Sequence, residues 1–224
     1  MMALVFPAMP TVTLPVTGRA ERFPVRRIFC VGRNYAEHTR EMGGDANEPP
    51  FFFTKPADAV VESGSRIPYP PATANLHHEA ELVVAIGRPG AMVAEADAAQ
   101  MVWGHATGND LTRRDLQSEA KAARRPWDMA KGFDKSAVIG AIRPGTMADA
   151  AIRCTVNGTQ RQSARLSDMI WTVPAIISAL SRLVSLSAGD LIFTGTPAGV
   201  GPLACGDTCR VEIEGLSPAT VTIA

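Results

Sequence analysis

Apolar runs of only a few residues, each bounded by glycine or proline, recur along this chain and constrain its fold more than any other feature. Examples are RRIFCVG (26–32), FFFT (51–54) and DLIFT (190–194). The sequence contains 19 glycines and 17 prolines but only 2 tyrosines. Runs of this length are typical of strands, whereas a helix needs a longer periodic pattern. The sequence therefore predicts many short strands and turns rather than a helical bundle.

A hairpin is the clearest local signal. Asn157-Gly158 separates the segments 152–156 and 159–163, and this dipeptide favours the two-residue turn that joins antiparallel strands. Further strands are predicted at 26–32, 51–54, 79–86, 102–109, 190–194 and 208–214. The last of these alternates apolar and charged residues, so one of its faces is expected to be buried.

Helices are expected between these strands, at 34–42, 94–101, 112–124 and 172–183. The third is predicted to begin with a capping box, because the hydroxyl of Thr112 precedes the carboxylate of Asp115 by three residues. The segment 62–75 is rich in Gly, Pro and Ser and is expected to be irregular. Together these elements predict an α+β fold that is predominantly β, with a few short helices and a loose N-terminal arm at 1–25.

Charge and composition exclude several classes of protein. Lys+Arg and Asp+Glu both number 22, whereas a nucleic-acid-binding surface normally needs a basic excess. A hydrophobic fraction of 46% argues against disorder, and no apolar stretch approaches the ~20 residues of a membrane-spanning helix. The stretch 1–16 lacks a basic start and is interrupted by prolines, so a secretory signal is not expected. The cysteines lack disulfide-like spacing, which predicts a cytoplasmic protein with thiols buried as small apolar groups.

The densest group of reactive side chains is LHHEAE (76–81). Glu79 and Glu81 lie two apart in a predicted strand, so both should project from one face. Asp110 lies at the end of another predicted strand. Because neighbouring carboxylates repel each other, a buried group of three calls for a cation, and an all-oxygen site suits Mg²⁺, Mn²⁺ or Ca²⁺ better than Zn²⁺. The alternative is that Glu79 and Glu81 line a solvated strand face.

Two further motifs are weaker. The segment 77–79 contains H-x-E, but zinc deaminases also need P-C-x-x-C, which Cys205 and Cys209 do not supply. The glycine-rich loop 195–201 lacks the signatures of a P-loop and of a dinucleotide-binding turn. It is either a turn between strands or a loop whose backbone N–H groups and Thr196 hydroxyl hold a substrate carboxylate.

Two pairs of polar residues have the spacing of neighbours on a helix. His38 and Glu41 lie three residues apart, and a carboxylate in that position would orient the imidazole as a general base. A surface ion pair is the alternative interpretation. Arg114 and Gln117 have the same spacing in the helix that follows Asp110, so both start near the predicted cation site.

These segments together resemble the fumarylacetoacetate hydrolase family. The matching motifs are GRNYAEHTREM (32–42), FFTKP (52–56), NLHHEAELVVAIG (75–87), GNDLTRRDLQ (108–117), PWDMAKGFDKSAVIG (126–140), VNGTQRQ (156–162) and GDLIFTGTPAGVG (189–201). They occur in family order. Within the family the chain is similar to the short, single-domain acylpyruvate and fumarylpyruvate hydrolases.

The resemblance implies a mixed β-roll or sandwich, a single catalytic domain at 26–224 and a homodimer. It implies a Mg²⁺ cofactor, with Mn²⁺ or Ca²⁺ as alternatives, held by Glu79, Glu81 and Asp110. His38 and Glu41 correspond to the dyad that activates water, and Lys131 to a residue that stabilises an enolate. The positions that correspond to substrate contacts are Arg114, Gln117, Thr196 and Lys55.

The reaction that the resemblance implies is metal-dependent hydrolysis of the C3–C4 bond of a 2,4-dioxo acid. The segment 124–137 is most similar to fumarylpyruvate hydrolases of gentisate breakdown, so 3-fumarylpyruvate, split into fumarate and pyruvate, is the expected substrate. Arg33, Arg124 and Arg125 are candidates for the contact with its distal carboxylate. Alternatives are a general acylpyruvate hydrolase, an oxaloacetate decarboxylase or tautomerase, and a non-catalytic metal-dependent scaffold.

Overall fold

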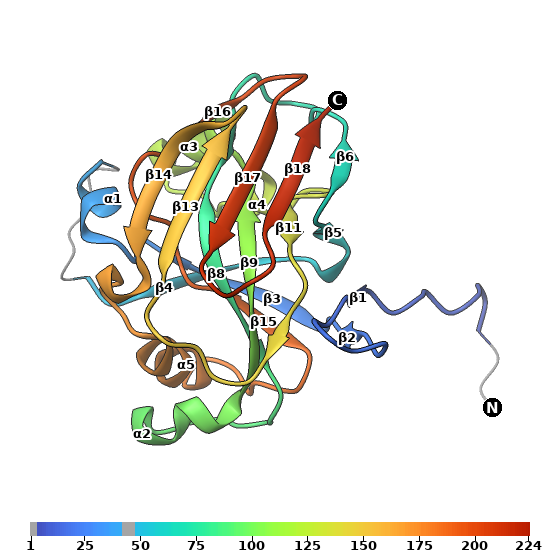
Figure 1. Cartoon of the computed structure of the whole chain (residues 1–224), viewed down its shortest axis with the longest axis vertical. Coiled ribbons are helices and arrows are strands. Elements are labelled where there is room, and N and C mark those ends of the chain that lie inside the picture. The colour runs from blue at the N-terminus through green and yellow to red at the C-terminus, as the bar shows by residue number, and fades with distance from the viewer. Residues whose placement is uncertain (1–3, 42–47) are drawn as a thin grey trace.

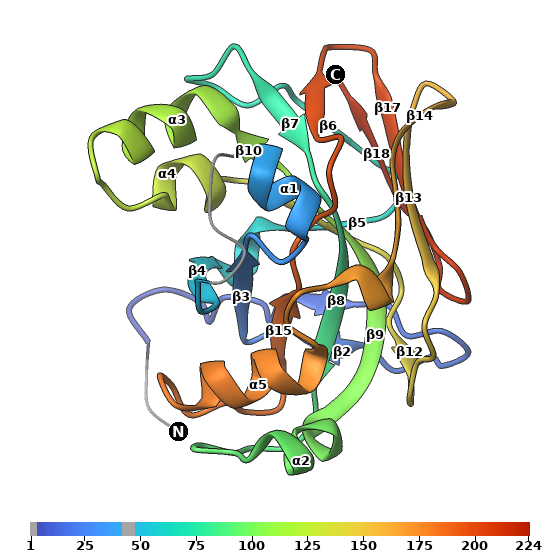
Figure 2. The same cartoon turned by 90° about the vertical axis from the view of Figure 1, so that its left-hand side faces the viewer.

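Two β-sheets pack against each other and form the body of the protein (Figures 1 and 2). The computed structural model describes residues 4–41 and 48–224. The larger sheet has the strand order β4 (Phe51–Lys55), β3 (Arg27–Gly32), β15 (Asp190–Phe193), β8 (Ala80–Ile86), β9 (Val102–Asp110), β11 (Ala137–Ile139), β5 (Val60–Glu62), with β12 (Arg143–Pro144) also paired to β9. The smaller sheet has the order β14 (Thr159–Arg165), β13 (Ala151–Val156), β17 (Thr208–Ile213), β18 (Ala219–Ile223), β6 (Ser65–Ile67).

Two short sheets and several short helices surround this body. The short sheets are β10 (Thr112–Arg113), β7 (Leu76–His78), β16 (Gly201–Leu203) and the pair β1 (Thr13–Leu14), β2 (Phe23–Pro24). The helices are α1 (Ala36–Glu41), α2 (Glu95–Ala98), α3 (Arg114–Ala122), α4 (Asp128–Lys131) and α5 (Val173–Ser181). Figure 2 shows α2 and α5 together at one end of the molecule, and α3 and α4 at the other end. The predicted α+β class, predominantly β with a few short helices, is confirmed.

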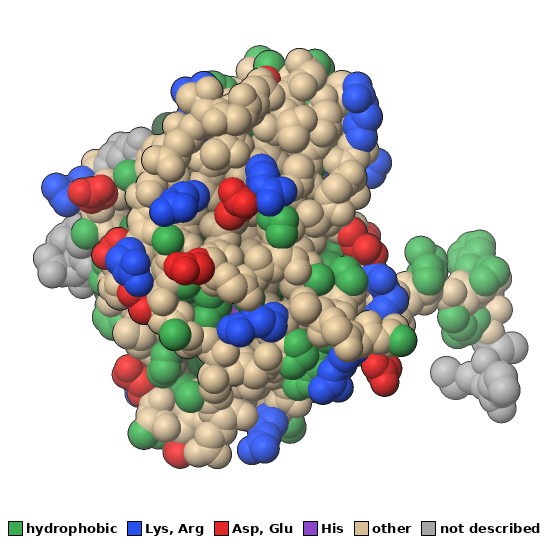
Figure 3. Space-filling model, viewed as in Figure 1, with side chains coloured by type: hydrophobic (Ala, Val, Ile, Leu, Met, Phe, Trp, Pro, Cys, Tyr) green, Lys and Arg blue, Asp and Glu red, His purple; other side chains and the backbone are tan. Residues whose placement is uncertain are grey.

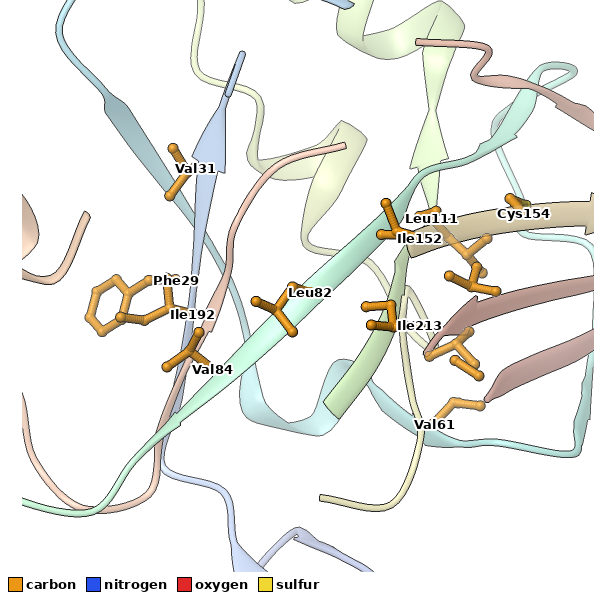
Figure 4. Close-up of a cluster of buried hydrophobic side chains, with 14 of the residues drawn as sticks. Phe29, Val31, Val61, Leu82, Val84, Leu111, Ile152, Cys154, Ile192 and Ile213 are labelled. Atoms are coloured by element: carbon orange, nitrogen blue, oxygen red, sulfur yellow. The ribbon is translucent and has the colours of Figure 1, made fainter. Parts of the chain in front are cut away.

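The strand β8 is buried along its whole length because both faces of the larger sheet are covered. Leu82, Val84 and Ile86 face a core shared with the smaller sheet, which contributes Ile152 and Ile213 (Figure 4). Side chains at the intervening positions of β8 belong to a second cluster on the opposite face. A continuous apolar strand is the expected sequence for a sheet packed on both sides.

The hairpin predicted around Asn157-Gly158 joins β13 to β14. Asn157 has φ 50° and Gly158 has φ 79°, the left-handed conformations that this tight turn requires. In β17 exposed and buried residues alternate as predicted. Both predictions depended on local pattern, and both are confirmed.

Three local expectations were wrong, the first two for a tertiary reason. Ser65–Ile67, placed in an irregular segment, forms β6 because it pairs in parallel with β18 from the other end of the chain. The capping box at Thr112 is absent: its hydroxyl donates to the Asp110 carbonyl, and Asp115 accepts hydrogen bonds from the distant Thr73 and Ala74. Cys205 is exposed, whereas the other cysteines are buried as expected.

The N-terminal segment has two parts. Residues 4–11 are exposed and extend away from the body (Figure 1). From Thr13 onward the chain forms the β1–β2 hairpin, whose apolar side chains Leu14, Val16 and Phe23 are buried in the second cluster. This second part of the predicted arm therefore covers one face of the larger sheet.

Charged side chains of both signs are interspersed over the face that the smaller sheet presents (Figure 3). This agrees with the equal numbers of acidic and basic residues in the sequence. Among the helices that the structure describes, none has the length and apolar character needed to cross a membrane.

Candidate active site

Three buried carboxylates meet at the junction of β7, β8 and β9. Glu79 occupies the position between β7 and β8, Glu81 lies in β8, and Asp110 is the last residue of β9. The register pairs Ala80 with Asn109, so Glu79 lies opposite Asp110, whose N–H donates to the Glu79 carbonyl (2.9 Å). One carboxylate oxygen from each of the three lies within 4.8 Å of the others. The structure thus brings together the three side chains predicted to form a cation site.

Three cationic side chains contact this carboxylate cluster. Lys131 in α4 donates to Glu79 Oε2 and Asp110 Oδ2, both at 2.7 Å. Lys55 in β4 pairs with Asp110 Oδ1 at 2.7 Å, and Arg114 at the start of α3 pairs with Glu79 Oε1. Lys55 and Lys131 are only 2% and 1% exposed. Because a buried ammonium is costly unless it is paired, the carboxylates and these cations depend on one another.

Burial and charge move the pKa values of the two glutamates in opposite directions. Burial alone would raise the pKa of Glu79, but the charges of Lys131 and Arg114 outweigh it and hold that pKa below its usual range. Burial raises the pKa of Glu81 well above its ordinary value, and repulsion from Asp110 and Glu79 adds to the rise. Glu81 is therefore the carboxylate that lacks a sufficient counter-charge.

The carboxylate cluster fits a divalent cation. Glu81 Oε2 accepts a hydrogen bond from the Gly195 N–H (2.6 Å), but Glu81 forms no ion pair with any of the residues described. A cation among the three carboxylates would supply the missing positive charge and relieve their repulsion. Oxygen-only donors are the ligands that Mg²⁺, Mn²⁺ and Ca²⁺ prefer.

A cavity of about 430 Å³ opens onto the cluster. It is lined by most of the predicted site residues, namely His38, Glu79, Glu81, Arg114, Gln117, Lys131 and Thr196. Phe53 and Trp127 add apolar wall, and Arg33 and Lys121 add positive charge. This volume lies within the range of sites that hold small organic ligands. Residues far apart in the sequence therefore form one site beside the carboxylates.

A comparison with known families identifies the family to which this chain belongs. Residues 27–224 match the family described as fumarylacetoacetate (FAA) hydrolase C-terminal. The chain belongs to the fumarylacetoacetate hydrolase family. The match includes all the predicted site residues and leaves only the N-terminal segment outside.

Relatives within the fumarylacetoacetate hydrolase family carry more than one activity. A fumarylpyruvate hydrolase from Ralstonia sp is 44% identical over 179 residues, which cover 79% of this chain and 93% of the relative. The mitochondrial oxaloacetate tautomerase of Homo sapiens is 41% identical over 202 residues, which cover 88% of this chain and 91% of the relative. The crystal structure of fumarylpyruvate hydrolase from Pseudomonas aeruginosa in complex with Mn²⁺ and pyruvate is 45% identical, with a TM-score of 0.97 and 99% of both chains covered. The chain is an enzyme of the carbon–carbon hydrolase type.

In this member of the fumarylacetoacetate hydrolase family, α1 carries His38 to the cavity, where its side chain is buried. Asn34 precedes the helix and donates from Nδ2 to the carbonyls of Trp171 (3.0 Å) and Thr194 (2.7 Å). Its Oδ1 accepts the Trp171 N–H (2.7 Å). These bonds hold the start of α1 against the end of β15. The predicted partner Glu41 ends the helix, but its side chain, like residues 42–47, lies outside the described part of the chain.

Lys55 occupies a different position from the other predicted substrate contacts. Besides pairing with Asp110, its Nζ donates to the carbonyl oxygens of Leu111 (3.2 Å) and Lys131. Among the described residues it is not one of those lining the cavity. Two of the three N–H groups of the ammonium are therefore used by backbone carbonyls, and its charge is paired with Asp110. The geometry gives Lys55 a role in positioning Asp110 rather than in contacting a ligand.

The glycine-rich loop 195–201 donates a hydrogen bond to one of the carboxylates and also lines the cavity. Gly195 has φ +95°, and a Cβ there would lie 2.6 Å from Asn34 Cβ, so only glycine fits. Its N–H donates to Glu81, whereas the sequence interpretation assigned such groups to a substrate carboxylate. Thr196 lines the cavity, and its hydroxyl accepts a hydrogen bond from Gln162 Nε2 (2.8 Å).

Gln162 and Asn109 are supporting residues that the sequence analysis missed. Gln162 Oε1 accepts the Ala80 N–H (3.0 Å), and Asn109 Oδ1 accepts the Glu79 N–H (3.0 Å). Both amides are buried, and each fixes the backbone beside a carboxylate. Each is a polar residue that points inward from a strand, and this position was the available signal. Burying a polar side chain costs free energy unless the side chain is hydrogen-bonded.

Proposed function

We propose that this enzyme hydrolyses the C3–C4 bond of a 2,4-dioxo acid, with 3-fumarylpyruvate as its substrate and Mg²⁺ as its cofactor. The observation that carries the proposal is the cavity in which His38, Lys131 and two carboxylates of the cluster face one another. The similarity of this chain to a fumarylpyruvate hydrolase crystallised with Mn²⁺ and pyruvate supports the same assignment.

The pyruvyl part of the substrate is proposed to lie over the carboxylate cluster. Arg114 and Gln117, one turn apart on α3, present a guanidinium and an amide to the cavity, and Thr196 adds a hydroxyl. A guanidinium suits a carboxylate ligand because of its paired donors. These side chains would fix the 1-carboxylate and orient the 4-oxo carbon toward His38.

Glu79, Glu81 and Asp110 would hold the cation. When bound, such an ion acts as a Lewis acid toward the oxygens of a 2-oxo acid and lowers the energy of the developing negative charge. The contribution of the protein is to fix the three carboxylates on a buried strand pair, with their backbones held by Gln162 and Asn109.

His38 is the proposed general base. It would take a proton from water at an imidazole nitrogen, oriented by Glu41, so that hydroxide adds to C4. Cleavage of the C3–C4 bond then releases fumarate and leaves pyruvate as its enolate. Lys131 already gives two N–H bonds to Glu79 and Asp110, and an ammonium has a third for the enolate oxygen. Protonation of the enolate carbon ends the turnover.

Removing the cation should abolish turnover of fumarylpyruvate. Chelation with EDTA is expected to lower kcat at least about 100-fold, because a Lewis acid supplies several kcal/mol to such a transition state. Excess Mg²⁺ or Mn²⁺ should restore activity. The measurement is the loss of the ultraviolet absorbance of the dioxo acid, with pyruvate assayed separately. Full activity after chelation would contradict a metal-dependent reaction.

Oxaloacetate tautomerisation is the second candidate function. It is favoured by the 41% identity to the human tautomerase and by 37% identity to an oxaloacetate tautomerase of Escherichia coli (strain K12). Tautomerisation moves protons without adding water, so it would need the same cavity but no cleavage. Acetylpyruvate and oxaloacetate should therefore be assayed beside fumarylpyruvate. Turnover of oxaloacetate alone would replace the hydrolase assignment with this one.

Arg33 is the proposed contact for the distal carboxylate of fumarylpyruvate. It lines the cavity from a left-handed backbone position (φ 59°) and pairs with Glu48 at 3.1 Å, whereas Arg124 and Arg125 are exposed and, among the described residues, do not line it. Arg33→Met is expected to raise KM for fumarylpyruvate roughly tenfold, the effect of about 1.4 kcal/mol.

Acetylpyruvate is the internal control for this variant, because it lacks a distal carboxylate and its KM should not change. Arg124→Met removes a comparable charge outside the cavity and should behave as the wild type. Equal increases of KM for both substrates would show that Arg33 maintains the shape of the cavity and does not bind the distal carboxylate.

A further inference from the structure

A second group of metal-ligating side chains lies apart from the carboxylates. His78 comes from β7, Cys154 from β13 and Cys209 from β17, so three strands of two different sheets supply it. One ligand atom from each lies within 4.8 Å of the others, and all three residues are at most 1% exposed. Figure 4 shows Cys154 beside Ile152 in the buried core. The reaction proposed above uses none of these groups.

Two of the spacings between the three ligand atoms are close to those of a tetrahedral zinc site. His78 Nδ1 lies 3.5 Å from Cys154 Sγ, and Cys154 Sγ lies 3.5 Å from Cys209 Sγ. With Zn–S bonds of about 2.3 Å and Zn–N bonds of about 2.0–2.1 Å, tetrahedral angles place the sulfurs roughly 3.8 Å apart and nitrogen roughly 3.6 Å from sulfur. These two spacings need to change by only a few tenths of an ångström to admit an ion, and the ligand atoms of His78 and Cys209 lie within 4.8 Å of each other.

A disulfide is the competing arrangement of the two sulfurs, and the sheet register disfavours it. Cys154 is paired with Val211, and Cys209 with Val156, so the cysteines are diagonal neighbours rather than directly opposed. Diagonal Cα atoms are about 7–8 Å apart, whereas a disulfide needs less than about 7 Å. Forming the bond would require movement of the backbone within a packed sheet.

Two buried amides contact the cluster. Asn109 Nδ2 donates to Cys209 Sγ (3.3 Å), and a donor at sulfur stabilises a thiolate. Gln162 Oε1 is fixed by the Ala80 N–H and lies 3.1 Å from His78 Nδ1. Because this oxygen can only accept, a metal ion at Nδ1 would replace the ring N–H that points to it. The cluster thus has three ligands and an adjacent oxygen.

We propose that His78, Cys154 and Cys209 form a second metal site, specific for a thiophilic cation such as Zn²⁺. Two thiolates and an imidazole bind Zn²⁺ in preference to Mg²⁺, Mn²⁺ and Ca²⁺. The carboxylate cluster, which offers only oxygen ligands, suits Mg²⁺, Mn²⁺ and Ca²⁺ better than Zn²⁺. Binding replaces the thiol protons, which go to solvent, and involves no change of oxidation state. The ion would tie β7 to the smaller sheet directly behind Glu79.

Cobalt(II) is the probe for this site. The full-length protein, reduced with a phosphine and stripped of metal, receives excess Mg²⁺ to fill the carboxylate cluster and then Co²⁺. One equivalent of Co²⁺ per chain should give the strong near-ultraviolet thiolate band and the intense visible bands of a tetrahedral complex. Zn²⁺ should then remove these bands. Weak octahedral absorption alone would overturn the proposal, because it would place cobalt on oxygen ligands.

Variants assign the ligands. Cys154→Ser and Cys209→Ser should each lose at least about half of the intensity of the thiolate band, because each removes one of two thiolates, and the double variant should lose it entirely. Cys205→Ser, which changes an exposed cysteine, should retain it. A band of undiminished intensity in either core variant would overturn the assignment.

A measurement on the unaltered protein keeps the proposal testable if either core variant fails to fold. With Mg²⁺ present, Zn²⁺ should release at least one proton per ion into weakly buffered solution near neutral pH, since thiols lose protons on binding. Absence of both proton release and zinc retention after gel filtration would overturn the proposal. Recovery of a Cys154–Cys209 disulfide by mass spectrometry of protein handled without reductant would also overturn it.

Discussion

Replacing His38 by alanine is expected to lower kcat for fumarylpyruvate by about 10²–10⁴-fold, the usual contribution of a general base. KM should change little, because Arg114 and Gln117, the proposed contacts of the substrate carboxylate, lie on a different helix. Steady-state kinetics with pyruvate detection gives both constants. The expected split, a large effect on kcat and a small one on KM, identifies a group that acts mainly in the transition state.

The structure offers a matched control for that variant. His105 is as buried as His38, at 7% against 6% exposed, but contacts the Gly145 carbonyl and is not among the described residues lining the cavity. His105→Ala should therefore leave kcat within about twofold once folding is verified by circular dichroism. A His38→Ala enzyme that keeps more than a tenth of wild-type kcat would remove His38 from the role of base.

Lys131→Met is expected to damage both stability and turnover. Removing one partner from a buried ionic group typically costs about 3–5 kcal/mol, because Glu79 and Asp110 would be left without the ammonium that they share. For a chain of this size that corresponds to a fall in Tm of roughly 6–20 °C. Loss of a donor to the enolate should lower kcat by about 10²–10³-fold.

Calorimetry with and without Mg²⁺ tests the electrostatic part of this prediction. Mg²⁺ should recover part of the lost stability, because it neutralises the same carboxylates. Lys135→Met makes the same change at an exposed position and should alter Tm by no more than about 2 °C. If Lys131→Met were as stable as this control, the ion pairs of Lys131 would contribute nothing measurable.

The carboxylate cluster could be predicted in part from local sequence. Glu79 and Glu81 lie two apart, and Asp110 ends the strand that pairs with β8, so alternation placed the first two side chains on one face. Alternation left a solvated strand face as the alternative, and the resemblance to the family favoured the cation site. The hairpin at Asn157-Gly158 was equally local. In each case the deciding interaction lies within a few residues or in the register of one strand pair.

Features created by distant partners could not be predicted. Ser65–Ile67 is a strand only because Val221–Ile223 lies beside it, and Asp115 binds Thr73 and Ala74 rather than capping its own helix. The contact between His78, Cys154 and Cys209 depends on how two sheets pack. The spacing of these residues in the sequence does not predict that packing. Local pattern specifies elements, whereas packing decides which polar groups meet.

The pairing of three carboxylates with Lys55, Lys131 and Arg114 has a consequence for the order in which ligands bind. With every group ionised, the charges of these six side chains cancel. A divalent cation then leaves it two charges positive, and a substrate with two carboxylates restores neutrality. Each ligand thus creates the electrostatic conditions that favour the other, so cation and dianion should bind with positive thermodynamic linkage.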